Sequence, residues 1–243
     1  MLKLRAMSAN LIAERVAVVR ERMARARALD GGRHQDRAGD VALIAVTKTQ
    51  TVEAMRDAVE AGLTTFGENR VQEWEAKRAA FAETGVRCHL IGHLQTNKAR
   101  KAAAIFDRVD SVDSMAVARK LDEAAGAEGK RLGVLIEVHL SGEESKSGVA
   151  EQDLDALTDA IRGFTNLKLE GLMTVPPFFE DAEKVRPYFR RLRELRDLLR
   201  PRTGLGLPAL SMGMSHDFEI AIEEGATEVR IGSAIFGERA KKV

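Results

Sequence analysis

The chain has 243 residues, 44% of them hydrophobic, which is enough material to bury a sizeable core. Its 38 basic and 37 acidic residues give a formal net charge of +1, and this balance excludes the strongly positive surface of a protein that coats nucleic acid. The longest apolar run, Val41–Val46, has about six residues, far fewer than the roughly 20 that span a bilayer.

The amino-terminal segment is basic but does not have the pattern of a signal peptide. Residues 1–29 carry seven lysines and arginines against two glutamates, and Glu14 and Arg15 interrupt the apolar block that a signal peptide needs. An organelle-targeting peptide is the alternative. Apolar residues recur at helical spacing, however, at Ile12, Val16, Val19 and Met23. We therefore predict a helix docked on the core and, because Cys88 has no cysteine to pair with, a cytoplasmic protein.

From residue 41 onward, strand-like and helix-like segments alternate. The expected strands are 41–50, 63–69, 86–92, 108–114, 131–140, 167–175, 207–215 and 227–233. In the helical segments between them, Gly62 is expected to end the first helix and Ser114 to cap the fourth. The helix after residue 184 places its apolar residues on one face, at Val185, Phe189, Leu192, Leu195 and Leu199.

This alternation predicts βαβ units and a parallel sheet. Eight units in a chain of this length favour a single closed (β/α)8 TIM barrel over residues 41–237, preceded by a helix and loop at 1–40, all in one domain. The alternative is an open, doubly wound sheet. No glycine-rich dinucleotide fingerprint follows the first strand, which disfavours it.

Functional side chains of such barrels lie at the carboxyl ends of the strands. This rule nominates Lys48, Asn69, His93, Ser141, Thr174, Ser211 and residues 230–233. If Lys48 points inward, burial lowers the pKa of its amine, and a neutral amine can form an imine with a carbonyl ligand. A solvated surface lysine is the alternative reading.

The segment after the last strand is a candidate anion site. Gly232 and Ser233 precede a short helix whose first N–H groups lack partners within the helix, and the small-residue loop Ser211–Ser215 is the expected partner. By strand alternation Arg230 faces the same way as Gly232. The alternatives are an ordinary N-cap serine and, for Arg230, an ion pair with Glu228 or another inward acid. His89 and His93 straddle Gly92 and do not form a helical metal pair, so we expect no metal.

Seven blocks of sequence together resemble a known family, the pyridoxal phosphate homeostasis proteins. They are AVTKTQ, FGENRVQE, LIGHLQTNK, SGEESKSG, GLMTVPP, LSMGMSHDFEIAI and VRIGSAIFG, in the family's order. The resemblance implies a barrel like the amino-terminal domain of alanine racemase and a bound pyridoxal 5'-phosphate (PLP) held as an imine of Lys48. It implies further contacts as follows: phosphate at Ser211, Met212, Gly232 and Ser233, the pyridine nitrogen at Arg230, and Asn69 lining the site. His139 departs from the family's usual asparagine.

These residues favour binding without turnover. Arginine can only donate to the ring nitrogen, so it disfavours the protonated ring that withdraws electrons strongly. The chain ends about ten residues after the last expected strand, without room for a second domain that adds a catalytic tyrosine, and Tyr188 is its only tyrosine. We therefore expect a monomeric PLP carrier that supplies apo-enzymes, with no catalytic residues and no nucleic-acid or membrane partner.

Two alternatives remain. One is a PLP-dependent amino-acid racemase, and the other is a barrel aldolase that uses Lys48 without cofactor. We interpret the loop Ser141–Gly148 and the turn Phe178–Phe179 as gates for release of the ligand.

Overall fold

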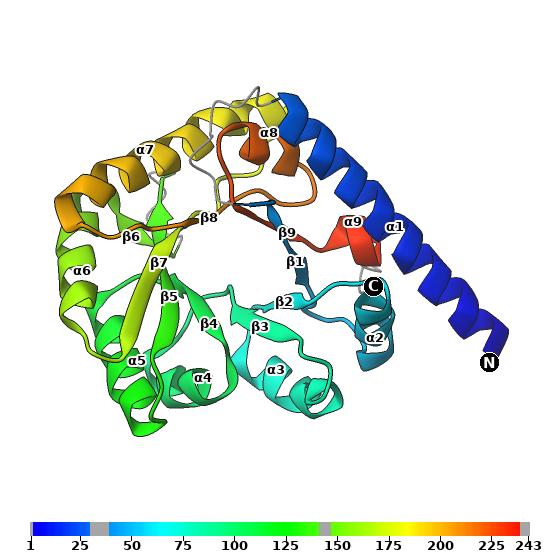
Figure 1. The fold of residues 1–243 in the computed structure, drawn as a ribbon, viewed down its shortest axis with the longest axis horizontal. Helices are drawn as coiled ribbons and strands as arrows, with labels where there is room; N and C mark the ends of the chain where they lie inside the picture. Colours follow the sequence, from blue (N-terminus) through cyan, green and yellow to red (C-terminus); the bar gives the residue numbers. More distant parts are fainter. Residues whose placement is uncertain (1, 30–38, 141–146, 239–243) are drawn as a thin grey trace.

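The computed structural model of the chain describes residues 2–29, 39–140 and 147–238. Eight parallel strands close into a barrel, in which β4 pairs with β5 and β9 pairs with β1 (Figure 1). The barrel strands are β1 (Ala42–Val46), β2 (Thr65–Glu68), β3 (Arg87–Leu90), β4 (Arg108–Val112), β5 (Leu132–His139), β7 (Leu167–Met173), β8 (Ala209–Ser211) and β9 (Glu228–Ile231). A two-residue strand, β6 (Val149–Ala150), adds to β5. The predicted (β/α)8 barrel is confirmed.

Helices surround the barrel (Figure 1). They are α2 (Val52–Glu60), α3 (Val71–Lys77), α4 (Ala99–Ile105), α5 (Met115–Ala127), α6 (Glu151–Gly163), α7 (Arg186–Thr203), α8 (Phe218–Glu223) and α9 (Ser233–Phe236). Short 3-10 turns cover Arg78–Phe81, Thr96–Lys98 and Ala182–Val185. Ser114 caps α5 by accepting from the N–H of Val117, and Gly62 follows α2 with a φ of 80°, as expected.

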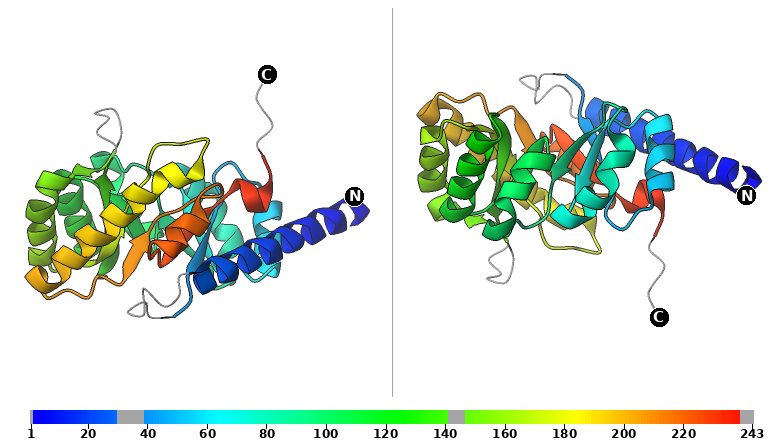
Figure 2. Two further views of the ribbon diagram at one scale, coloured as in Figure 1. Left: turned by 90° about the horizontal axis from the view of Figure 1, so that it is seen from above. Right: turned by 90° about the horizontal axis from the view of Figure 1, so that it is seen from below.

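The amino-terminal helix α1 (Leu2–Leu29) runs along the outside of the barrel and contacts α2, α8 and α9 (Figure 2). The four apolar residues predicted to dock it are all buried: Ile12, Val16, Val19 and Met23. Arg22 adds a guanidinium 4.6 Å from the ring centre of Phe218. In the described part of the chain, no helix combines the length and the hydropathy that a membrane crossing needs.

The lumen of the barrel is more polar than the space between the strands and helices. On β5, Val134 and Ile136 join the large core under the helices, so Leu135 between them faces the lumen. There it packs with Met173 and Ala209 in a small apolar cluster. Charged side chains lie in the same lumen, next to the site at the carboxyl ends of the strands.

Candidate functional site

A cavity of about 380 Å³ opens at the carboxyl ends of β1 and β9, between the segments that follow β7, β8 and β9. Its size suits a small ligand. The residues lining it are Val46, Lys48, Gln50, Pro176, Phe178, Met214, Ser215, His216, Asp217, Arg230, Gly232, Ser233 and Gly237. A larger cavity, of about 710 Å³, lies between α1 and the opposite ends of the strands, away from the face where barrels carry their chemistry.

Four of the site residues predicted from sequence come together in the 380 Å³ cavity. Lys48 lies two residues past the end of β1 and is half-buried. Arg230 is the third residue of β9, and Gly232 and Ser233 follow it at the junction with α9. The structure thus places an amine and the start of a helix in the lining of one cavity, from neighbouring strands that pair in register.

The start of α9 forms a cradle for an anionic oxygen. The hydroxyl oxygen of Ser215 accepts hydrogen bonds from the N–H of Gly232 (3.3 Å) and from that of Ala234 (3.3 Å). Two N–H groups therefore aim at one acceptor, which is the arrangement that phosphate oxygens take at helix starts. Because Ser215 also lines the cavity, a phosphate oxygen can accept hydrogen bonds from these N–H groups and from the Ser215 hydroxyl. The residues present fit a phosphorylated ligand.

The loop after β8 is shaped so that Ser215 reaches this cradle. Gly213 has a φ of 90°, and a Cβ there would lie 2.5 Å from the Cβ of Ala221, so the turn requires glycine. Asp217 Oδ1 accepts from the N–H of Met214 (2.6 Å), which closes the next turn. Burial raises the pKa of Asp217, and this hydrogen bond opposes the increase.

Arg230 is held rigidly beneath the cavity. Its side chain is buried, with Nη1 donating to Ser211 Oγ (2.8 Å) and Nη2 to the carbonyl of Thr174 (2.8 Å). Burial lowers the pKa of this guanidinium, and Asp110 and Glu137 oppose the decrease. A fixed cationic donor thus contributes to the lining of the cavity, and hydrogen bonds within the protein set its orientation.

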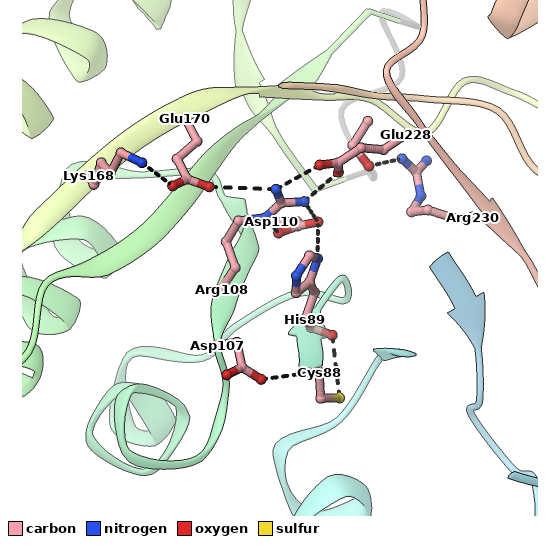
Figure 3. Close-up of polar contacts among 10 residues, drawn as sticks. Cys88, His89, Asp107, Arg108, Asp110, Lys168, Glu170, Glu228 and Arg230 are labelled. Atoms are coloured by element: carbon pink, nitrogen blue, oxygen red, sulfur yellow. Dashed lines mark hydrogen bonds and ion pairs between the residues drawn. The ribbon is translucent and has the colours of Figure 1, made fainter. Parts of the chain in front are cut away.

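The ion pair of Arg230 with Glu228, considered as an alternative above, is not what holds the guanidinium. Arg108 binds the carboxylate of Glu228, with its Nη1 donating to Oε1 at 2.8 Å (Figure 3). The same guanidinium donates to Asp110 from Nε (2.7 Å) and from Nη2 (2.9 Å). The inward acid next to Arg230 therefore has its own partner.

Two residues predicted to contact the phosphate lie outside the lining of this cavity, and their contacts stay predictions. Ser211 is fully buried and does not line the cavity, and its hydroxyl oxygen is used to hold Arg230. The N–H of Met212 donates to the carbonyl of Glu228 (3.1 Å), and its side chain belongs to the apolar core. Both residues still belong to β8 or its direct continuation, whereas the chain reaches the cavity two positions later, at Met214.

Asn69 does not line the cavity either. It follows β2, and its backbone packs so closely on Gly92 that a Cβ on Gly92 would lie 2.5 Å from the carbonyl oxygen of Asn69. The backbone of Asn69 therefore packs on the neighbouring strand end, and its predicted contact with the ligand stays a prediction.

Replacing Ser211 with alanine is expected to destabilise the fold by about 2 kcal/mol, because a buried charged donor on Arg230 loses its acceptor. Urea unfolding measures this difference. The matched control is the exposed Ser147, where the same change should have an effect within about 0.5 kcal/mol. Equal stability of the two variants would show that the Ser211 hydroxyl does not hold the guanidinium.

Aromatic residues form the rim of the cavity. Phe178 lines it although 76% of the residue is exposed, and its ring lies 5.1 Å from that of His216. His216 Nε2 lies 3.2 Å from the carbonyl oxygen of Phe179, which joins the rim segments after β7 and β8. This position suits the predicted gate at Phe178–Phe179. The other predicted gate, Ser141–Gly148, falls largely outside the described residues and stays a prediction.

A cluster of charged side chains comes from the first residues of β4 and β9 and from the third residues of β3 and β4. His89, Asp110 and Glu228 place ligand atoms within 4.8 Å of one another. The guanidinium of Arg108 lies among them and binds both carboxylates (Figure 3). The guanidinium thus occupies the space between the two carboxylates and donates to both, so we assign no metal to the cluster.

The fold and the site define a barrel of the alanine racemase type, and a model of the family described as "Alanine racemase, N-terminal domain" matches residues 32–240. The pyridoxal phosphate homeostasis protein of Pseudomonas aeruginosa is 45% identical over 231 residues, covering 95% of this chain and 96% of its own length. That of Aquifex aeolicus is 46% identical over 197 residues, covering 81% of this chain and 86% of its own. The chain belongs to the pyridoxal phosphate homeostasis protein family, which confirms the resemblance read from its motifs.

A solved structure agrees with this assignment. The structure of PipY from Synechococcus elongatus PCC7942 with PLP bound is 37% identical, with a TM-score of 0.82, and the match covers 93% of this chain and 100% of that one.

Proposed function

We propose that this protein binds PLP covalently at Lys48 and serves in PLP homeostasis as a carrier. The observation that carries the proposal is that Lys48 and the Ser215 cradle at the start of α9 line one cavity, with Arg230 fixed in the same lining. PLP needs these three groups: an amine for its aldehyde, N–H donors for its phosphate and a donor for its ring nitrogen. The names of the relatives and the PLP in PipY support the same ligand.

Each residue has a separate task in this proposal. Lys48 supplies the amine, and the N–H groups of Gly232 and Ala234 bind the phosphate with the hydroxyls of Ser215 and Ser233. Arg230 donates to the ring nitrogen. PLP supplies an aldehyde that condenses reversibly with amines and a ring that withdraws electrons when its nitrogen is protonated. Since an arginine can only donate, it keeps that nitrogen unprotonated.

The surroundings of the site favour storage over turnover. Tyr188 is the only tyrosine of the chain, and its ring packs 5.8 Å from that of Phe179, outside the cavity lining. A phenol is therefore not placed to exchange a proton with a ligand on Lys48. Holding PLP as a lysine adduct also keeps its aldehyde from reacting with other amines.

The proposal extends to the setting in which the protein works. We infer that it acts in the cytoplasm as a single domain and a monomer, and that it releases PLP to apo-enzymes. The single cysteine, Cys88, is buried and has no second cysteine to pair with, which suits a reducing compartment.

A titration tests the proposal. Adding PLP to the purified protein should produce the visible absorption band of a lysine adduct with one equivalent bound per chain. Incubating the loaded protein with L-alanine should produce D-alanine no faster than free PLP does. A protein that takes up no PLP contradicts binding, and racemisation well above the rate of free PLP contradicts the carrier role.

A further inference from the structure

Next to the proposed site lies a nearly buried lysine that the sequence did not single out. Lys77 ends α3, and 12% of its side chain is exposed. Its Nζ donates to the carbonyl of Thr47 (3.0 Å), to Glu68 Oε1 (3.0 Å) and to Glu73 Oε1 (2.7 Å). Thr47 directly precedes Lys48, so this ammonium group is bonded to the backbone beside the site lysine.

The same two carboxylates also bind the residues on either side of Lys48. The hydroxyl of Thr47 donates to Glu68 Oε1 (2.8 Å). On the other side, the N–H of Thr49 donates to Glu73 Oε1. Both peptide neighbours of Lys48 are therefore attached to one cluster, which we call the Lys77 cluster and which consists of Glu68, Glu73 and Lys77.

The backbone at Thr49 has an unusual conformation. Its φ is 66°, and Leu207 is the other non-glycine residue with a positive φ in the described part of the chain. A β-branched residue adopts this region only when its surroundings impose it. The hydrogen bond to Glu73 supplies such a constraint. The chain thus turns in a fixed direction directly after Lys48.

The Lys77 cluster depends on the charge of its lysine. The side chain of Glu68 is fully buried, and burial raises the pKa of this carboxyl, while hydrogen bonds and charge from Thr47 and Lys77 oppose the increase. For Glu73, burial also acts to raise the pKa, but the bonds from Lys77 and Thr49 outweigh it and the net pKa is lowered. Without the ammonium group, two acids would remain beside the same stretch of backbone.

We propose that Lys77 is a positioning residue for Lys48. It holds residues 47–49 so that the Lys48 amine enters the cavity in line with the ligand carbonyl, and it acts through the backbone because it does not itself line the cavity. Reacting groups held in the correct geometry combine much faster than mobile ones, and small displacements are costly. This inference rests on the proposed binding of PLP at Lys48.

The test compares PLP with pyridoxine 5'-phosphate, which has an alcohol in place of the aldehyde. In Lys77→Met, the rate of adduct formation with PLP should fall about tenfold or more, because the amine is no longer aligned. The affinity for pyridoxine 5'-phosphate should change less than about threefold, because the cradle at α9 is intact. Lys77→Arg, which keeps the charge, should recover part of the rate.

A second readout needs no cofactor. Acetic anhydride labelling of the unloaded protein, followed by mass spectrometry, reports the reactivity of the Lys48 amine directly. Labelling of Lys48 should change in Lys77→Met and stay at the wild-type rate in Lys101→Met. Lys101, on α4, is the matched control. It pairs with Glu75 of α3, the helix that Lys77 ends, but its side chain is half-exposed.

The outcomes separate the inference from the proposed function. If the wild-type protein forms no adduct, the proposed function fails. If it does, and Lys77→Met forms the adduct at the same rate, the positioning role is wrong. Equal loss of both ligands would mean that Lys77 only supports the fold, which also overturns the inference. Should Lys77→Met not fold, Glu73→Ala, which removes the acceptor of the Thr49 N–H, must show the same split between the two ligands.

Discussion

Lys48→Ala is expected to abolish the PLP adduct that borohydride traps in the wild-type protein. The variant loses the amine but keeps the N–H groups of Gly232 and Ala234 and the hydroxyl of Ser215. It should therefore still bind PLP weakly through the phosphate, with a dissociation constant raised about 100-fold, or about 2.7 kcal/mol. Its absorption spectrum with PLP should match that of free PLP.

The matched control is Lys168→Ala, in which an exposed lysine is removed from the opposite end of the barrel. It should form the adduct at the wild-type rate and stoichiometry. Mass spectrometry after borohydride reduction measures both variants. A reduced adduct of full stoichiometry in Lys48→Ala would place the tether at another lysine and contradict the role of Lys48.

Glu137→Gln is expected to make the protein more stable at alkaline pH. Glu137 lies on β5 two residues after Leu135, on the same lumen-facing side, and is 7% exposed. Burial raises its pKa to about 7, Arg230 opposes the shift, and Asp113 adds to it. The folded protein therefore holds a proton that the unfolded chain, with a pKa of 4.5, releases between pH 4.5 and 7.

The direction of the effect follows from linkage. Since the folded state binds more protons in this window, stability falls as pH rises from 4.5 to 7 and stays low above it. The difference of about 2.5 pKa units corresponds to about 3 kcal/mol. Glutamine cannot ionise, so the stability of Glu137→Gln relative to the wild type should increase by about 3 kcal/mol between pH 4.5 and pH 8. Urea unfolding at both pH values measures this change, and a stability difference that does not vary with pH would contradict the raised pKa of Glu137.

Much of the fold could be predicted because strands and helices leave local signals. The stripe from Val185 to Leu199 marked α7, and each of its five apolar residues is buried. The run Val41–Val46 marked β1, and Gly62 marked the end of α2. Boundaries were less accurate where loops take over. Of the expected strand 207–215, only Ala209–Ser211 forms a β-strand, and Gly213 turns the chain beyond it.

The same turn explains where the predicted site residues lie relative to the cavity. Arg230 and Gly232 lie on or next to a regular strand, where alternation predicts the direction of the Arg230 side chain, whereas the alternation of β1 left the direction of Lys48 open. Met212 lies at the start of a glycine-containing loop that has no such period. The positive φ of Gly213 carries Ser215, rather than Met212, to the start of α9.

The Lys77 cluster could not be read from a local pattern. It joins a helix residue to the carbonyl of Thr47, thirty residues earlier in the chain. One signal was present: Glu73 and Lys77 are four apart on a helix, a spacing that favours an ion pair. Glu68, an acid that ends a buried strand, needed a partner and could have directed attention to that pair.

The most direct test of PLP binding at this site is mass spectrometry of the wild-type protein after loading with PLP and reduction with borohydride. If the amine after β1 faces the cradle at α9, as the lining of the cavity indicates, one pyridoxyl group per chain should lie on the peptide that contains Lys48. A label on a different lysine, or one spread evenly over exposed lysines such as Lys101 and Lys120, would contradict it.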